Sequence, residues 1–477
     1  MATVNKKSLR DELDHLKAEF NVLRKQNNLS KEAFVLFKSL FVLIDMMLVI
    51  FLEKTTQKHA KNSSKPSSQT GPDKSALGKP GSKGKGKQGN DETAQNIRIV
   101  EKQTTVPVTT CDQCGEPLEK VAAYDQERRT KIDILFETTI LHVDADIKAC
   151  PHCQAVVKGK HPADMPGPLQ YGNGLKAYVI QLIVTQMLSL KRVQQLLKTL
   201  MGRVIAEKTF LSYILALYVA LEGWENSAMA ELLKERALNV DETSMRVNKR
   251  NQWVHVYSSG DITLKFLQPG RGKQAIHSIG IIPRYGGTII HDCLKAYLSY
   301  QHCAHGLCGS HLLRELTFIV DSNDYRWAKN MKRLLQAACK TVSTNPSKKL
   351  SAKKYATLQK QYRNILTRGL NEMPPVPQKQ SGKRGRIAKS DAHNLLERLS
   401  KYESAVLLFA RDPYVSFTNN RAERDLRMGK VKQKVSGCFR SEIYAKAYCR
   451  ISSYLETMSN KGINPLIAIQ MVLNKEI

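Results

Sequence analysis

The chain has 477 residues and a formal net charge of +31, because 74 lysines and arginines outnumber 43 aspartates and glutamates. That length allows two to four domains, each able to bury its own core. So basic a balance indicates a polyanionic partner, of which nucleic acid is the commonest large one. Ten cysteines without a secretory signal pattern argue against a disulfide-stapled secreted protein and predict a cytoplasmic protein with reduced thiols or metal sites.

The N-terminal segment, residues 1–57, is predicted to be helical. Its first apolar residues recur at 4-3-4-3 spacing, the pattern of an a/d seam. They are Leu9, Leu13, Leu16, Phe20 and Leu23. The seam lapses after about two heptads, so both a dimer zipper and a short amphipathic helix that packs on another element are compatible with it. Residues 34–52 are almost continuously apolar, but Lys38 and Asp45 interrupt them, and ionised groups are costly inside a bilayer. We therefore expect a buried or oligomerising helix there, and no membrane partner.

Residues 58–107 are predicted to be a flexible, basic linker. Between residues 58 and 90 the chain holds eight lysines and one acidic residue among Gly, Ser and Pro, a composition that cannot bury a core. A second loop of this type, residues 378–390, interrupts a helical region. Each of these segments is either a spacer or a loose, salt-sensitive contact to phosphates.

Two Cys-x-x-Cys pairs predict a structural zinc module over residues 108–160. The predicted ligands are Cys111, Cys114, Cys150 and Cys153. Each pair can clamp one edge of a tetrahedral ion, and four thiolates leave no open position for catalysis. The alternative is four free thiols that meet this spacing by accident. A second group has suitable ligand types, but its spacing fits no closed site, and we expect no second zinc there. It comprises His302, Cys303, His305, Cys308 and His311.

The remaining segments predict a helical region followed by an α/β sheet. Residues 161–235 indicate helices around Gly202, as either a helix-turn-helix or plain helix packing. Beyond them, short runs rich in β-branched and aromatic residues predict strands. The expected strands are 237–247, 252–259, 262–267 and 286–292. Helices are expected at about 271–282 and at 311–320, the second preceded by a short strand. An inserted helical and basic region at 322–410 and a helical tail at 441–475 follow. This order predicts a sheet with an antiparallel part.

Three carboxylates are candidate metal ligands. Asp241 and Asp292 each end an apolar strand, and strand ends are where α/β folds gather their chemistry. Glu423 lies at a predicted helix start, where it completes a capping box if Asn420 is the N-cap. If Glu423 instead reaches the strand edge, the three can hold two Mg²⁺ ions, which prefer oxygen ligands and stabilise in-line displacement at phosphorus. Asp425 would then point away from that edge.

Ordered motifs make the chain resemble the transposases of insertion-sequence-66 elements. They include VDETSMRV at 240–247, DCLKAY at 292–297, CGSHLLREL at 308–316 and FTNNRAERDLRM at 417–428, together with the N-terminal helix and both cysteine pairs. The resemblance implies a DDE-type enzyme with a ribonuclease-H-like fold, in which Asp241, Asp292 and Glu423 are catalytic and hold two Mg²⁺ ions, or Mn²⁺ in their place. It also implies supporting roles for His311, Arg314, Asn420 and Arg424, and DNA contacts by Arg421, Arg427, Lys430, Lys432 and Lys434.

We therefore expect a multidomain α+β protein. Its predicted parts are an N-terminal helical segment (1–57), a linker (58–107), a zinc-binding module (108–160), a helical region (161–235), a ribonuclease-H-like α/β catalytic domain with its helical insertion (236–435) and a helical C-terminal region (436–477). The expected activity is cleavage of double-stranded DNA at element ends and strand transfer into target DNA. The alternatives are a non-catalytic, zinc-dependent DNA-binding regulator and a structural protein that oligomerises through its N-terminal helix. Further copies of the chain and small companion proteins of the same element are expected partners, in a nucleoid-associated setting.

Overall fold

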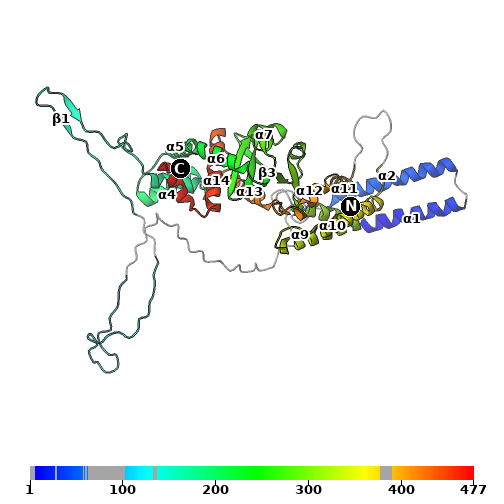
Figure 1. Cartoon of the computed structure of the whole chain (residues 1–477), viewed down its shortest axis with the longest axis horizontal. Helices are drawn as coiled ribbons and strands as arrows, with labels where there is room; N and C mark the ends of the chain where they lie inside the picture. Colours follow the sequence, from blue (N-terminus) through cyan, green and yellow to red (C-terminus); the bar gives the residue numbers. More distant parts are fainter. Residues whose placement is uncertain are drawn as a thin grey trace. The chain divides into compact units, whose positions relative to one another are not determined.

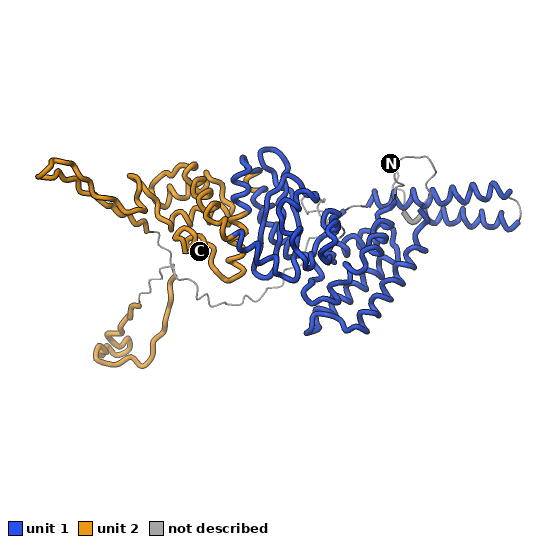
Figure 2. Tube along the Cα trace, turned by 45° about the horizontal axis from the view of Figure 1, so that its top comes forward, with its two compact units in different colours: residues 1–85, 225–433, 438–449 blue, residues 86–224, 434–437, 450–477 orange. Residues whose placement is uncertain are grey.

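The computed structural model describes residues 6–26, 30–56, 58–59, 62, 103–132, 137–376 and 389–476. The chain divides into two compact units, coloured separately in Figure 2. Unit 1 holds residues 1–85, 225–433 and 438–449, and unit 2 holds residues 86–224, 434–437 and 450–477. Most of the predicted linker and nearly all of the 378–390 loop lie outside the described residues.

A five-stranded mixed sheet, green in Figure 1, forms the centre of unit 1. Its strands are β3 (Ala237–Val247), β4 (Arg250–Ser259), β5 (Ile262–Gln268), β6 (Thr288–His291) and β7 (Ala304–Leu307). The order across the sheet is β5-β4-β3-β6-β7. The first three strands in sequence are antiparallel neighbours, whereas β6 pairs parallel with both β3 and β7. The predicted α+β class with an antiparallel part is therefore confirmed.

The sequence explains the tight connection of β3 to β4. Only Asn248 and Lys249 separate the strands, and both have left-handed φ angles, 45° and 61°. Two left-handed residues give the turn whose twist matches a right-twisted hairpin, and asparagine tolerates this conformation well. Every residue of β6 is buried, as expected of a strand with neighbours on both sides and both faces covered.

Helices surround this sheet and continue into the predicted insertion. The helices of this part of the chain are α7 (Lys273–Ile279), α8 (Gly309–Asn323), α9 (Arg326–Thr344), α10 (Ala352–Glu372), α11 (Asp391–Lys401), α12 (Glu403–Leu407) and α13 (Asn420–Ser436), with 3-10 turns at Ile282–Arg284, Tyr297–Ser299 and Leu408–Ala410. Trp327, Tyr362 and Leu396 are at most 2% exposed in the insertion core. Burial of each side chain of this size stabilises the fold by about 1.5–3 kcal/mol. Gly369 is required there, because a Cβ would lie 2.6 Å from Leu396 and 2.8 Å from Trp327.

The N-terminal segment is a helical hairpin of α1 (Lys6–Lys25) and α2 (Lys31–Thr55). The Phe20 ring lies 5.5 Å from the ring of Phe34 and 5.4 Å from that of Phe41. Asp45, which interrupts the apolar run, accepts a 2.6 Å ion-pair contact from Lys17 of α1. By length and composition alone, α2 is a helix that could cross a membrane.

Glu53 fixes the C-terminal end of α2 to the insertion. Its carboxylate accepts hydrogen bonds from the N–H groups of Asp391 (2.6 Å) and Ala392 (3.0 Å) at the start of α11. A negative charge is favourable at that position, because the first N–H groups of a helix have no partner within it. Apolar side chains on the same stretch of α2 are buried. They are Met46, Val49 and Leu52.

Unit 2 is mainly helical. Its elements are α3 (Asn173–Val184), α4 (Leu190–Met201), α5 (Glu207–Ala220), α15 (Pro465–Leu473) and a small hairpin of β1 (Ile147–Ala149) and β2 (Val156–Lys158). Three helices contribute residues to both units: α6 (Glu222–Leu232), α13 and α14 (Glu442–Asn460). The C-terminal α15 packs on α3 and α5. α4 ends at Gly202, whose φ of 68° provides the left-handed cap that terminates many helices.

Candidate active site

Asp241 lies on β3, and Asp292 directly follows its parallel neighbour β6. Asn239 and Ile290 are the last parallel partners of the two strands, and each aspartate comes two residues later along the chain. The shared register therefore holds both at the same level of the sheet. Backbone groups orient them, because Oδ1 of Asp241 accepts from the next N–H at 2.8 Å and Oδ1 of Asp292 accepts from the second N–H along the chain at 3.0 Å.

Burial and crowding raise the pKa of Asp241 to about 7. Burial is the largest cause; the negative charge of Asp292 adds to it, Glu423 adds a smaller amount, and His311 acts in the opposite direction. The three predicted carboxylates therefore share one electrostatic environment, and we refer to Asp241, Asp292 and Glu423 as the acidic cluster. Carboxylates whose negative charges act on one another are stabilised by a bound cation.

Glu423 contributes to the cluster from the first turn of α13. Its Oε1 lies 3.5 Å from Nδ1 of His311 and 4.0 Å from Sγ of Cys308, both on the start of α8. The first backbone hydrogen bond of the helix runs from the Glu423 N–H to the carbonyl of Asn419 at 3.2 Å. Asn419 is thus the N-cap, and Asn420 is the exposed first helical residue. The capping box with Asn420 does not form.

Asn419 ties the start of α13 to β3 and to the start of α8. Its side chain is 1% exposed. The side-chain amide donates to the carbonyl of Val240 at 2.8 Å and accepts from the amide of Asn239 at 2.9 Å, both on β3. Its backbone N–H donates to the sulfur of Cys308 at 3.1 Å. Sequence reasoning selected Asn420 instead; an Asn-Asn pair before a helix indicates a cap, but only the facing strand decides which asparagine is buried.

His311 faces Glu423 as a cation. Burial alone would lower the pKa of His311, but Cys308, Glu423 and Asp292 outweigh that effect and raise the pKa to about 9. An imidazolium there offsets part of the negative charge of the cluster. Arg314, the other predicted supporting residue of α8, is partly buried one turn further along the helix.

A fourth carboxylate, Glu242, was not anticipated from the sequence. Burial, followed by the charges of Asp292 and Asp241, raises the pKa of Glu242 to about 8. The Tyr297 hydroxyl donates to its Oε2 at 3.0 Å. The available signal was adjacency to Asp241, but alternation along a strand predicts that neighbours point to opposite faces. Glu242 thus adds negative charge next to the cluster.

The predicted DNA-contacting residues of α13 divide by exposure. Arg427 and Lys434 have exposed side chains that can meet phosphates; so has Arg424, which was predicted to support the site and lies 3.8 Å from Asp425. The other three are turned into the protein. The Arg421 guanidinium donates to backbone carbonyls of the β4–β5 connection, and the Lys430 ammonium donates to Ser244 of β3. Lys432 is 8% exposed, and burial lowers its pKa to about 8.

Asp425 lies on the opposite side of α13 from Glu423, as expected. Its Oδ2 accepts hydrogen bonds from the hydroxyls of Ser258 (2.6 Å) and Thr263 (3.1 Å) on β4 and β5. These contacts explain why the helix carries two acidic residues close together, because one faces the cluster and the other anchors the helix to the sheet.

Each predicted zinc-binding cysteine pair forms a tight turn. The N–H of Gly115 donates to the carbonyl of Cys111 at 2.9 Å, and the N–H of Gln154 donates to that of Cys150 at 2.8 Å. Backbone N–H groups within each turn point at the first sulfur and lower the pKa of the Cys111 and Cys150 thiols. The thiolate is the form that binds zinc, so the donor chemistry of each pair fits that metal.

The four cysteines do not converge in the described part of the chain. Among those residues, the metal-ligating atoms that come within 4.8 Å of one another in a group of three belong to Cys308, His311 and Glu423. The two cysteine pairs therefore stand as separate turns, each with the conformation that one half of a zinc site requires.

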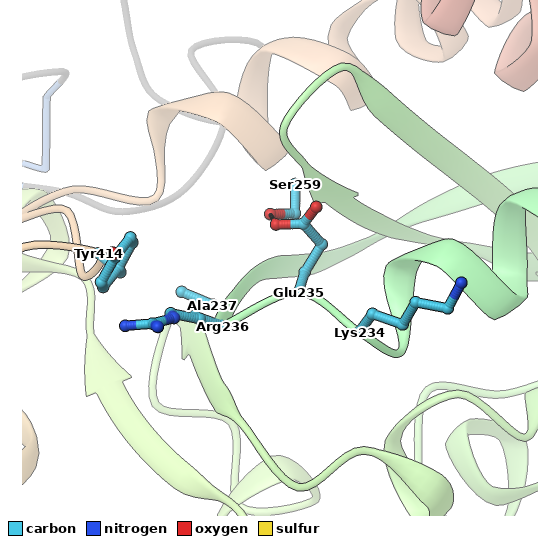
Figure 3. Close-up of a pocket in the computed structure, with 6 residues that line it drawn as sticks. All are labelled: Lys234, Glu235, Arg236, Ala237, Ser259 and Tyr414. Carbon is cyan, nitrogen blue, oxygen red and sulfur yellow. Dashed lines mark hydrogen bonds between the residues drawn. The ribbon is translucent and has the colours of Figure 1, made fainter.

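A polar pocket lies at the start of β3 (Figure 3). Its lining residues are Lys234, Glu235, Arg236, Ala237, Ser259 and Tyr414. The Arg236 guanidinium lies over the Tyr414 ring, 4.6 Å from the centroid, and Glu235 accepts a 3.0 Å hydrogen bond from Ser259. Lys234 extends away from these side chains (Figure 3). Glu235 is the single carboxylate among these lining residues, whereas the acidic cluster combines three, so the acidic cluster is the better candidate for metal-dependent chemistry.

Comparison with known proteins identifies the family. A search of curated proteins finds no match to the chain. A family model described as Transposase IS66 family matches residues 168–447, from just before α3 into α14. That match includes all three members of the acidic cluster but neither the N-terminal hairpin nor the cysteine pairs. Because it spans more than half of the chain, the protein belongs to the IS66 family of transposases.

Proposed function

We propose that the protein is a DDE-type DNA transposase, in which the acidic cluster cuts the ends of an insertion element and joins them to target DNA. The observation that carries this proposal is the shared electrostatic environment of Asp241, Asp292 and Glu423, which come from β3, the end of β6 and the start of α13. Membership of a transposase family supports DNA as the substrate.

The sheet supports a ribonuclease-H-like core. Three antiparallel strands are followed by two strands that run parallel to the first, in the order β5-β4-β3-β6-β7. This is the arrangement expected of that fold, with acidic residues at the level where the parallel strands end. The helices of the 322–410 region are then an insertion between the second and third acids.

Two Mg²⁺ ions, or Mn²⁺ in their place, are the cofactors that the acidic cluster would hold. Its donors are carboxylate oxygens, which these ions prefer. The raised pKa of Asp241 reflects burial and like charges that a cation would compensate. When bound, the ions stabilise the attacking and leaving oxygens of an in-line displacement at phosphorus.

The chain's own residues hold the reacting groups in place. Backbone N–H groups orient Asp241 and Asp292, Asn419 fixes the start of α13, and His311 faces Glu423. In the first reaction, water attacks the phosphodiester at the element end and a 3′-hydroxyl leaves. In the second, that 3′-hydroxyl attacks a target phosphodiester, and a target 3′-hydroxyl leaves.

DNA would be held chiefly by positive charge. Arg424, Arg427 and Lys434 are exposed on α13 and suit phosphate contacts. We also propose that one Zn²⁺ joins the two cysteine pairs, and that this module and the adjacent helices of unit 2 bind the element ends. The thiolate-favouring turns at Cys111 and Cys150 support that assignment.

Glu423→Gln tests the proposal. It removes the charge of one proposed metal ligand but keeps its size, so the affinity for duplex DNA carrying the element ends should stay nearly intact while Mg²⁺-dependent cleavage falls to background. Glu442→Gln, an exposed glutamate of α14, is the matched control and should cleave normally. Normal cleavage by Glu423→Gln, or by a chain with all three acids replaced, would show that the acidic cluster is not catalytic. DNA binding without any cleavage by the unmodified chain would instead indicate a non-catalytic DNA-binding regulator.

A further inference from the structure

We propose that Cys308, His311 and Glu423 form a binding site for a thiophilic divalent cation such as Zn²⁺. One ligand atom from each residue lies within 4.8 Å of the other two. The set of one sulfur, one imidazole nitrogen and one carboxylate oxygen differs from the all-oxygen set that suits magnesium. The ligand geometry belongs to the chain itself, so the site does not depend on the proposed function.

The fold brings the three ligands together from two helix starts. Cys308 occupies the N-cap position of α8, and His311 is in the first turn, so their side chains share one side of the helix. Glu423 is in the first turn of α13, 115 residues after Cys308. Asn419 couples the two starts, because its N–H donates to the Cys308 sulfur at 3.1 Å and its carbonyl accepts from the Glu423 N–H at 3.2 Å.

The distances require little movement to accept an ion. Oε1 of Glu423 is 3.5 Å from Nδ1 of His311 and 4.0 Å from Sγ of Cys308. Zinc bonds of about 2.0–2.3 Å in a tetrahedron place ligand atoms roughly 3.3–3.8 Å apart. Three protein ligands leave a fourth position for water or a phosphate oxygen, which is the pattern of open zinc sites.

The surroundings also suit a soft cation. Cys308 is 1% exposed, and the side chains of His311 and Glu423 are 15% and 27% exposed. Nδ1 of His311 is buried and has no hydrogen-bond partner among the described residues, and a bound cation would take the place of the proton that His311 carries without metal. The backbone N–H of Asn419 donates to the Cys308 sulfur, and a contact of this kind stabilises a metal-bound thiolate. An ion here would occupy Oε1 of Glu423, so a thiophilic cation and the proposed magnesium ions would compete for one carboxylate.

The Cys-x-x-His spacing alone does not reveal this site. With the neighbouring His302, Cys303 and His305 it fits no closed four-ligand arrangement, and the structure directs those side chains elsewhere: His302 and His305 contact backbone carbonyls, as does Cys303. The third ligand comes from a distant helix, which only the tertiary structure supplies.

Cobalt titration of the full chain provides the test. Thiolate-bound Co²⁺ gives a ligand-to-metal charge-transfer band, and the four cysteines of the two Cys-x-x-Cys pairs supply the same background in every variant. Relative to the unmodified chain, Cys308→Ser should bind one equivalent of Co²⁺ fewer and lose part of the charge-transfer absorbance. Cys303→Ser removes a buried thiol outside the site and should change neither quantity.

Glu423→Gln gives a second measurement in case Cys308→Ser does not fold, which circular dichroism reports. It should weaken Co²⁺ binding at this site at least about tenfold, because even outer contacts of a metal ligand are worth that much. A folded Cys308→Ser chain with unchanged stoichiometry and band, or unchanged Co²⁺ affinity in Glu423→Gln, would overturn the site. Neither readout involves DNA cleavage, so failure of the proposed function leaves this test intact.

Discussion

At the residue scale, Asp241 carries an electrostatic cost in the folded protein without metal. Its folded pKa of about 7 lies above the ordinary value of 3.8. Between those pH values the folded state keeps a proton that the unfolded state releases, so the free energy of unfolding falls as pH rises through this window. This loss of stability is complete above pH 7, where the carboxylate is charged in both the folded and the unfolded state. Glu242 acts in the same direction, because its folded pKa is about 8.

Asp241→Asn should therefore stabilise the protein at pH 8 when no divalent cation is added. The amide removes the buried charge, and a shift of about three pKa units corresponds to at most about 4 kcal/mol. At pH 5 the folded aspartate is protonated while the unfolded one has largely ionised, so the difference between the two chains should shrink to about 1.6 kcal/mol. Calorimetric melting at both pH values measures this. Asp324→Asn, at an exposed left-handed position, is the control. A lower melting temperature for Asp241→Asn at pH 8 would contradict the argument.

At the scale of elements, two adjacent asparagines are expected to contribute differently to the stability of the start of α13. Asn419 is buried and bonds to Val240 and Asn239, whereas Asn420 is exposed. Asn419→Ala would leave the Val240 carbonyl and the Asn239 amide without these partners and loosen the start of α13, at a cost of about 1–3 kcal/mol. It should also loosen Glu423 and reduce Mg²⁺-dependent cleavage. Asn420→Ala should change stability by less than about 0.5 kcal/mol. Denaturant unfolding of the two variants distinguishes them, and equal losses would show that Asn419 does not hold the helix in place.

The same helix shows how far the sequence predicts the site. Strand ends and helix starts could be read from local pattern, and so could Asp241, Asp292 and Glu423 as candidates. The direction of each basic side chain could not. Helical spacing places Lys430 and Lys432 on α13 but does not say which face meets β3, because that depends on packing between residues far apart in the chain. For the same reason Asn419 and Glu242 had no distinguishing local signal.

At the scale of the whole molecule, the composition and the family match describe different extents of the chain. The charge of +31 predicted a nucleic-acid partner for the chain as a whole, whereas the family match covers residues 168–447. The N-terminal hairpin lies before that match, and its attachment to the insertion depends on Glu53. No local pattern predicts that attachment, because a glutamate near the end of a helix is ordinarily a solvated residue. Its partners are backbone N–H groups 338 and 339 residues away.

Glu53→Ala should release the end of α2 from α11. The change leaves two N–H groups at the start of α11 without their acceptor and removes a favourable charge from that helix terminus, which together cost about 1–3 kcal/mol. Hydrogen exchange should therefore become faster in the last two turns of α2 and the first turn of α11, while β3 and β6 keep their protection.

Glu32→Ala, which replaces an exposed glutamate in the first turn of α2, is the matched control and should leave exchange at α11 unchanged. The hydrogen bonds of Arg10 to Asn323, 2.8 and 2.9 Å long, remain in both variants, so α1 should stay attached to the end of α8 while the end of α2 loosens. Unchanged exchange at both α2 and α11 in Glu53→Ala would show that apolar packing alone holds the hairpin to the insertion.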